Sequence, residues 1–252
     1  KQHPPYQEIG IKDGDDFLQI NDSIIQIENE YYSSIRPKRV VGSGERPINI
    51  LKEKGIEYVE VRCMDNNPFL NSSIDKETAY FIEAFLMTSL MDEEKPCLNK
   101  EIKEIQNNWQ SVVKEGRKPN LDLKIDGKST PLKDAANIFL EKMKRFASSI
   151  PEDGKNLKEN ILKSIKTQEE KIINPDITPS GRIMIEMAKN DWTWEEFNKV
   201  YFKKNKEFFN EFKKDLSLFD EATKKSFLEL KEIESKNEVP FENFLKEYLS
   251  SI

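Results

Sequence analysis

The sequence predicts an α+β fold, in which a small antiparallel sheet is followed by a mainly helical region. Two observations support this fold class. From residue 1 to about residue 70, short extended segments alternate with turns that contain glycine or proline. From about residue 74 onward, apolar residues recur at the three- and four-residue spacing of amphipathic helices. The predicted domains are therefore residues 1–70, a sheet segment, and residues 71–252, a helical region.

The N-terminal part contains the predicted strands, which are residues 9–11, 17–20, 32–41 and 56–64. Lys12–Asp15 is a turn signal between the first two of them. A short helical stretch near Ile48–Lys54 lies in the link between the last two. Pro37 cannot donate a hydrogen bond to a sheet ladder, so its strand is predicted to lie at an edge or to bulge there.

Aromatic and charged side chains share one face of the last two strands, because side chains alternate between the faces of a strand. They are Tyr32, Arg36 and Lys38 on the first strand, and Glu60 and Arg62 on the second. The opposite face of the second strand carries Val59, Val61 and Cys63. This apolar face is predicted to be buried, with Cys63 as a core thiol.

Eight helices are predicted after residue 73, at about residues 75–90, 99–115, 131–149, 156–173, 179–190, 193–216, 220–236 and 240–250. Ser73 or Asp75 can cap the first helix, and Gly116 is the predicted stop of the second. Between the second and third helices, a short extended piece at residues 122–125 turns at Asp126–Gly127.

Composition excludes several classes of protein. The 252 residues include 40 basic and 46 acidic side chains, for a net charge of −6, and the only basic cluster is short, at Arg36–Arg39. A nucleic-acid partner is therefore not expected. No apolar run reaches the ~20 residues of a membrane helix, and no signal peptide is visible. Cys63 and Cys97 do not form a disulfide framework, so a cytoplasmic location is predicted.

The charged sheet face has two possible explanations on its pattern alone. A carboxylate beside several cations suits a site that handles phosphate and a divalent metal, because Mg²⁺ takes oxygen ligands and arginine matches phosphate oxygens. The same alternation also occurs in cross-strand ion pairs on an exposed sheet face. Both explanations remain open at this level.

Several segments, in order, resemble motifs of the glutamate–cysteine ligase family of the proteobacterial type. They are residues 27–39 (I-E-N-E-Y-Y-S-S-I-R-P-K-R), 43–45 (S-G-E), 55–62 (G-I-E-Y-V-E-V-R), 65–69 (D-N-N-P-F), 108–109 (N-W), 115–119 (E-G-R-K-P), 174–176 (N-P-D) and the helix start at 179–183. The likeness is strongest over residues 9–119 and weak after about residue 190.

The resemblance implies ATP-dependent joining of the γ-carboxylate of L-glutamate to L-cysteine through a γ-glutamyl phosphate, the first step of glutathione biosynthesis. It implies a curved, glutamine synthetase-like antiparallel sheet whose concave face forms the site. By the same resemblance, Glu60 is a Mg²⁺ ligand, Arg62 is a catalytic contact of the transferred phosphoryl group, and Tyr32 lines the cysteine pocket. Further substrate-binding residues are expected in the matching R-P-K-R run, at Arg36, Lys38 and Arg39.

Family members begin well before residue 1 of this sequence, so the chain is expected to be the C-terminal portion of such a ligase. The missing N-terminal half would carry the other metal-binding glutamates, the glutamate-binding residues and most of the cysteine pocket. The isolated chain is therefore expected to be inactive. The alternative is a non-catalytic helical binding or structural module that completes the site of a partner chain.

Overall fold

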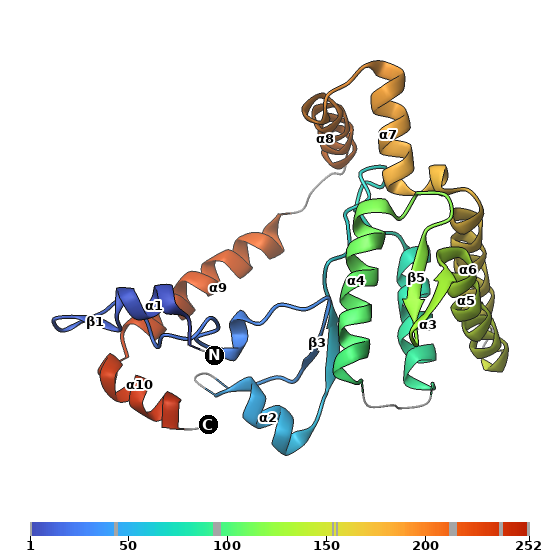
Figure 1. The fold of residues 1–252 in the computed structure, drawn as a ribbon. Coiled ribbons are helices and arrows are strands. Elements are labelled where there is room, and N and C mark those ends of the chain that lie inside the picture. Colours follow the sequence, from blue (N-terminus) through green and yellow to red (C-terminus); the bar gives the residue numbers. More distant parts are fainter. Residues whose placement is uncertain are drawn as a thin grey trace. The chain divides into compact units, whose positions relative to one another are not determined.

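A computed structural model describes residues 2–42, 45–92, 97–152, 154, 156–211, 216–236 and 239–250 (Figure 1). The chain forms two compact units, of which the first combines Lys1–Asp65 with Lys214–Ile252 and the second is the continuous stretch Asn66–Lys213. Helices predominate and the sheets are small and antiparallel, which confirms the predicted α+β class.

The first unit contains α1 (Pro4–Ile9), β1 (Lys12–Asp13), β2 (Asp16–Phe17), the 3-10 helix η1 (Glu28–Glu30), β3 (Ile35–Lys38), α2 (Pro47–Lys54), β4 (Tyr58–Val61), α9 (Ser217–Glu234) and α10 (Phe241–Ser250). The turn predicted at Lys12–Asp15 joins β1 to β2, although these strands have two residues each. The strands predicted at 32–41 and 56–64 are four residues long, because β3 and β4 pair only with each other among the residues that the structure describes.

Residues from the end of the chain pack against its beginning within this unit. The Phe241 ring of α10 lies edge-on to Phe17 of β2, with ring centroids 5.1 Å apart. Lys12 forms an ion pair with Glu242. The C-terminal helices are therefore part of the same unit as the strands that carry the predicted site, an arrangement that the helical pattern alone did not indicate.

The second unit contains α3 (Lys76–Leu90), α4 (Asn99–Glu115), β5 (Asp122–Ile125), β6 (Lys128–Pro131), α5 (Leu132–Ser149), α6 (Leu157–Ile173), η2 (Pro175–Ile177), α7 (Pro179–Asn190) and α8 (Trp194–Asn210). The predicted bounds of α4 and α7 are confirmed, and Asp75 caps α3 by accepting a hydrogen bond of 2.8 Å from the Thr78 N–H. The last part of the helix predicted at 193–216 lies outside the described residues.

Helices α3, α5 and α6 pack together around the main apolar core. Its buried members are Ala84, Leu140, Met143, Ala147, Ile161 and Ile165. On α5 and α6 these residues recur at helical spacing, and α3 contributes Ala84, which explains why the three helices associate here. No helix in the described parts of the chain is long and apolar enough to cross a membrane.

A second cluster joins α7 and α8 to the loop before α3. Phe197 is fully buried, and its ring contacts Tyr201, Trp194 and Phe69. The Arg182 guanidinium lies over Phe69, 3.7 Å from the ring centroid. The motif segments at residues 65–69 and 179–183 therefore meet in a packed aromatic cluster.

Tyr201 makes the second unit sensitive to alkaline pH. Burial, together with its hydrogen bond to the Glu186 carboxylate, raises the pKa of Tyr201 to about 12 from an ordinary value of 10.0. The protonated phenol is therefore favoured in the folded state, and its stabilising contribution is complete below pH 10 and lost as the pH rises through about 12. We expect Tyr201→Phe to remove this component of the pH dependence of the free energy of unfolding.

All three tryptophans, Trp109, Trp192 and Trp194, belong to the second unit, so their fluorescence reports its unfolding selectively. Urea unfolding followed by this fluorescence at several alkaline pH values tests the expectation, with exposed Tyr31→Phe as the matched control. Equal pH dependence in the Tyr201→Phe variant and the unmodified chain would contradict it.

Candidate functional site

The predicted site lies on the two-stranded sheet of the first unit. Strands β3 and β4 are antiparallel, and Arg36 lies directly opposite Glu60 in their register. The Arg62 N–H donates to the Ser34 carbonyl at 2.7 Å, which extends the pairing beyond the end of β4. This register carries side chains of both strands to a common face, as the period-two pattern predicted.

Four of the predicted residues meet on this face and form what we call the Glu60 cluster: Tyr32, Lys38, Glu60 and Arg62. Arg62 Nη2 lies 2.9 Å and Lys38 Nζ lies 3.4 Å from the same oxygen of Glu60, Oε2. The Arg62 guanidinium lies over the Tyr32 ring, 4.8 Å from its centroid. The Arg62 side chain is only 14 % exposed, so its guanidinium is held between an anion and an aromatic face.

The pairing shifts the titration of both partners. The hydrogen bond from Arg62 lowers the pKa of the Glu60 carboxyl below its ordinary value, with a further contribution from Lys38. The same hydrogen bond raises the pKa of Arg62. Both groups are therefore charged at neutral pH, and the cluster presents a fixed carboxylate between two cations.

Arg36 and Arg39 lie near the cluster but bind main-chain carbonyls. Arg36 donates to the carbonyls of Glu28 and Asn29, both at 3.3 Å. Arg39 donates to the carbonyls of Lys54 and Gly55, at 2.9 Å and 2.8 Å. Each arginine thus ties a neighbouring segment to the strand: Arg36 holds η1, and Arg39 holds the C-terminal end of α2.

The prediction that the opposite face is buried is wrong. Val59 is 42 % exposed, and Cys63, predicted to be a core thiol, is an exposed free cysteine. Cys63 also lies beyond the end of β4, at a left-handed φ of 60°, so it no longer follows the strand alternation. With only two strands and no helix packed beneath them in the described residues, this sheet leaves its apolar face open.

One ion pair of the first unit, between Arg46 and Glu28, has no signal in the sequence. Arg46 binds Glu28 through two parallel hydrogen bonds, Nε to Oε1 at 3.0 Å and Nη2 to Oε2 at 2.6 Å, and also donates to the Tyr248 carbonyl at 3.2 Å. Glu28 belongs to the I-E-N-E run, but its partner follows 18 residues later, after a loop. No local spacing signals such a contact.

We expect Glu28→Gln to loosen the attachment of α10 to the segment before β3. The Arg46 hydrogen bond lowers the pKa of Glu28, so its stabilising contribution is present above the ordinary value of 4.5 and is lost as the pH falls through the lower folded-state value. Loss of a charge-assisted hydrogen bond costs about 2 kcal/mol. Hydrogen exchange should therefore accelerate about thirtyfold in residues 28–30 and 241–250.

The matched control is Glu229→Gln, which changes an exposed carboxylate of α9 whose ion-pair partner, Lys225, is on the same helix. It should leave the exchange rates of residues 28–30 and 241–250 unchanged. Unchanged exchange in the Glu28→Gln variant at neutral pH would show that the Arg46 pair does not hold these segments together.

The cluster fits Mg²⁺ only in part. Glu60 offers a carboxylate oxygen, which is a ligand that Mg²⁺ accepts. Among the described residues, however, there is no group of three or more carboxylate, histidine or cysteine side chains that could hold a metal ion. Glu60 is thus suitable as one ligand of a set whose other members lie outside this group of side chains.

Comparisons with known proteins agree with the motifs. The family described as glutamate-cysteine ligase matches residues 1–112. Glutamate–cysteine ligase of Pseudomonas paraeruginosa is 36 % identical over 253 residues, which are 99 % of this chain and 47 % of the relative. The corresponding enzyme of Pseudomonas putida is 35 % identical and is covered to 48 %.

A solved structure gives the same result for the fold. The crystal structure of glutamate–cysteine ligase from Francisella tularensis, in complex with AMP, superposes with a TM-score of 0.88 at 31 % sequence identity. The match covers 100 % of this chain and 50 % of that chain, so this sequence spans about half the length of the relatives it matches. The chain is therefore similar to glutamate–cysteine ligases over nearly its whole length, and the likeness corresponds to the C-terminal portion of their sequence.

Proposed function

We propose that this chain is the C-terminal portion of an ATP-dependent ligase that joins the γ-carboxylate of L-glutamate to the amine of L-cysteine. The products are γ-glutamylcysteine, ADP and phosphate, in the first step of glutathione biosynthesis. The observation that carries the proposal is the Glu60 cluster, in which Arg62 Nη2 and Lys38 Nζ both lie within 3.4 Å of Glu60 Oε2 on one sheet face. Kinship with glutamate–cysteine ligases over 99 % of the chain supports it.

The reaction requires charge stabilisation more than a protein nucleophile. A γ-carboxylate oxygen of glutamate attacks the terminal phosphorus of ATP, the bond to the ADP oxygen breaks, and γ-glutamyl phosphate forms. The cysteine nitrogen then attacks the acyl carbon, phosphate departs, and the nitrogen loses its proton. Arg62 is suited to the first step, because a guanidinium can bind two phosphoryl oxygens at once.

The surroundings of Arg62 prepare it for this role. Glu60 holds the guanidinium on one side and the Tyr32 ring supports its face, so the plane of the group is fixed before substrate binds. A preorganised cation stabilises charge in the transition state without first reorienting. We assign Arg62 the contact with the transferred phosphoryl group on this basis.

Glu60 is proposed as one Mg²⁺ ligand, with the nucleotide phosphates and further side chains completing the set. The bound ion would supply neutralisation of phosphate charge. ATP as the nucleotide is consistent with the AMP complex of the Francisella tularensis enzyme. No other group in the cluster offers a carboxylate: Tyr32, Lys38 and Arg62 are the remaining members.

The other predicted substrate residues differ in how well their geometry suits binding. Tyr32 is 71 % exposed, so its ring is accessible to a cysteine substrate. Lys38 is a second cation beside Glu60 and can approach an anionic substrate group. Arg36 and Arg39 remain proposed substrate residues from the motif, but their hydrogen bonds to carbonyls favour a positioning role.

The proposal requires the remaining half of the enzyme as a partner. In that arrangement it would supply the other metal ligands and the glutamate and cysteine contacts, and it would cover the open apolar face of β3 and β4. The small-molecule partners are ATP, L-glutamate and L-cysteine, and the proposed compartment is the cytoplasm, where all three are available. The competing function is a non-catalytic module that completes the site of another chain.

We expect the isolated 252-residue chain to bind magnesium–ATP weakly and to form no γ-glutamylcysteine, because a single glutamate seldom holds Mg²⁺ without further ligands. Isothermal calorimetry with magnesium–ATP, together with an assay for γ-glutamylcysteine, measures both properties. Adding the remaining part of the enzyme, covalently or as a second chain, should restore both.

Two results would count against the proposal. Micromolar binding and turnover by the isolated chain would show that the missing half supplies less than we assign to it. If the chain assembles with the remaining part but the complete protein has no ligase activity, the result would instead favour the non-catalytic module.

A further inference from the structure

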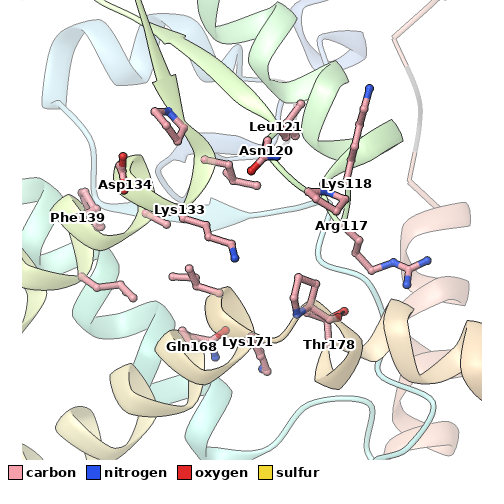
Figure 2. Close-up of a pocket in the computed structure, with 18 of the residues that line it drawn as sticks. Arg117, Lys118, Asn120, Leu121, Lys133, Asp134, Phe139, Gln168, Lys171 and Thr178 are labelled. Atoms are coloured by element: carbon pink, nitrogen blue, oxygen red, sulfur yellow. Dashed lines mark hydrogen bonds between the residues drawn. The ribbon is translucent and has the colours of Figure 1, made fainter.

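A cavity of about 790 Å³ lies in the second unit, and none of its lining residues belongs to the Glu60 cluster (Figure 2). Its walls come from α3, the turn after α4, the start of α5, the end of α6 and η2. Its volume falls within the range of small-molecule sites, which is roughly 300–1,000 Å³. More than half of its lining residues are apolar, including Phe81, Phe85 and Phe139. The cavity can therefore accept a ligand with an apolar body.

Among the charged residues that line the cavity, cations outnumber carboxylates. Four cations line the cavity, namely Arg117, Lys118, Lys133 and Lys171, against two carboxylates, Asp134 and Asp176. Arg117 lies 3.9 Å from Asp176, and Lys118 lies 2.7 Å from Glu115 outside the cavity. Lys171 interacts electrostatically with Asp75. Three of the cations thus already face an acidic partner.

Lys133 differs from the other three cations. In the part of the chain that the structure describes, no carboxylate pairs with its ammonium group. Figure 2 shows its side chain extending from the start of α5 into the middle of the cavity, towards α6. Lys133 belongs to the first turn of α5, and the N-cap residue Pro131 makes no side-chain capping bond. The N-terminal end of the helix therefore adds to the positive potential at Lys133.

Two sequence segments with no role at the Glu60 cluster converge on this cavity. The E-G-R-K-P run at residues 115–119 contributes four lining residues, and residues 174–178, which include the N-P-D run, contribute three. The segments are about 55 residues apart in the sequence and both line this cavity. Three of their charged members, Arg117, Lys118 and Asp176, lie at the cavity wall, where helix packing alone requires no charge.

We propose that this cavity binds a small organic anion, with an aromatic or aliphatic body against the phenylalanines and a carboxylate or phosphate on Lys133. A cation of the same shape is excluded by the excess of positive charge. The proposal does not depend on the ligase function, because the cavity is formed entirely by residues of the second unit.

The test uses methyl NMR of the 252-residue chain alone and of the longer protein, in which the chain is joined to the remaining part of the proposed enzyme. The probes are phenyl phosphate, benzoate, benzyl alcohol and benzylamine, which share a ring and differ in charge. The methyl signals of Leu132, Ala136 and Ile172 report on the cavity wall. We expect saturable shifts of these signals, with phenyl phosphate and benzoate binding more tightly than benzyl alcohol and benzylamine binding most weakly.

Three variants separate the contributions. Lys133→Gln should weaken phenyl phosphate about fivefold, as expected for an accessible ion pair, and leave benzyl alcohol unchanged. Lys128→Gln, an exposed lysine of β6 that does not line the cavity, is the matched control and should change neither. Ala136→Leu places a larger side chain in the cavity and should weaken all probes, including the neutral one.

Several outcomes would overturn the proposal. These are shifts that do not saturate, benzylamine binding as tightly as phenyl phosphate, or equal effects of Lys133→Gln and Lys128→Gln. Binding to the 252-residue chain that is lost in the longer protein would show that protein side chains fill the cavity there, and it would overturn the proposal as well. None of these results changes the ligase assay, so the two proposals fail independently.

Discussion

Replacing Arg62 with lysine should lower kcat of the proposed complete ligase by about 100-fold or more, by analogy with removal of one preorganised charge donor. Lysine keeps the positive charge but loses the planar fork that can bind two phosphoryl oxygens. It also loses the flat surface that lies over the Tyr32 ring. The loss should appear in kcat more than in KM for glutamate or cysteine, which marks an interaction made chiefly in the transition state.

A magnesium titration separates Arg62 from Glu60. Glu60→Gln weakens a metal ligand, so raising magnesium should partly restore its rate while leaving Arg62→Lys unrescued. Arg145→Lys makes the same chemical change on an exposed position of α5 and is the control for non-specific effects. Near-normal rates for both cluster variants at every magnesium concentration would mean that the face is a structural ion-pair lattice.

Replacing Gly181 with alanine should destabilise the second unit by about 3 kcal/mol, at the upper end of the cost of overpacking. A Cβ at this buried position would lie 2.6 Å from the Pro175 carbonyl oxygen and 2.7 Å from both Cα and the carbonyl oxygen of Asp176. These are main-chain atoms, so they cannot rotate away as a side chain would. Helices η2 and α7 would have to separate.

Gly14 provides the contrasting control, because nothing lies within 4 Å of its Cβ position but its φ is +62°. Alanine there should cost about 1 kcal/mol through backbone strain, and asparagine should recover much of it, since asparagine tolerates this conformation. At Gly181, asparagine should be at least as damaging as alanine. Urea unfolding followed by tryptophan fluorescence reports the Gly181 variants, and hydrogen exchange in residues 12–17 reports the Gly14 variants. Recovery by Gly181→Asn would contradict the steric explanation.

Local signals made the helices predictable. The bounds of α4 and α7 follow from apolar spacing, from Gly116 and from Pro179, all of which act within one or two helical turns. The strands were harder to delimit, because the length of a strand depends on its partner. Residues 32–41 have the composition of a strand, but only Ile35–Lys38 find a partner in β4. Burial of Cys63 was mispredicted for the same reason, since alternation identifies a face but not what covers it.

The candidate site was predictable where it depends on strand geometry. Side chains two residues apart lie on the same face of a strand, which predicts that Glu60 and Arg62 share a face. Their ion pair of 2.9 Å agrees with this prediction. The carbonyl partners of Arg36 and Arg39 depend on turns, which no periodicity describes. The cavity around Lys133 depends on segments far apart in sequence, so the motifs identified its walls without indicating that they meet.

Helix α10 packs against the N-terminal part of the first unit, and this has a consequence for the order in which contacts form during synthesis. Phe241 and Tyr248 contact Phe17 and Arg46, so the segment that carries the Glu60 cluster gains these neighbours only when α10 emerges. The continuous second unit is synthesised in between. At about 5–20 residues per second, the earlier segment waits on the order of 10–35 s for its C-terminal complement. During that interval its unpaired strand edges are open to chaperones and to other nascent chains.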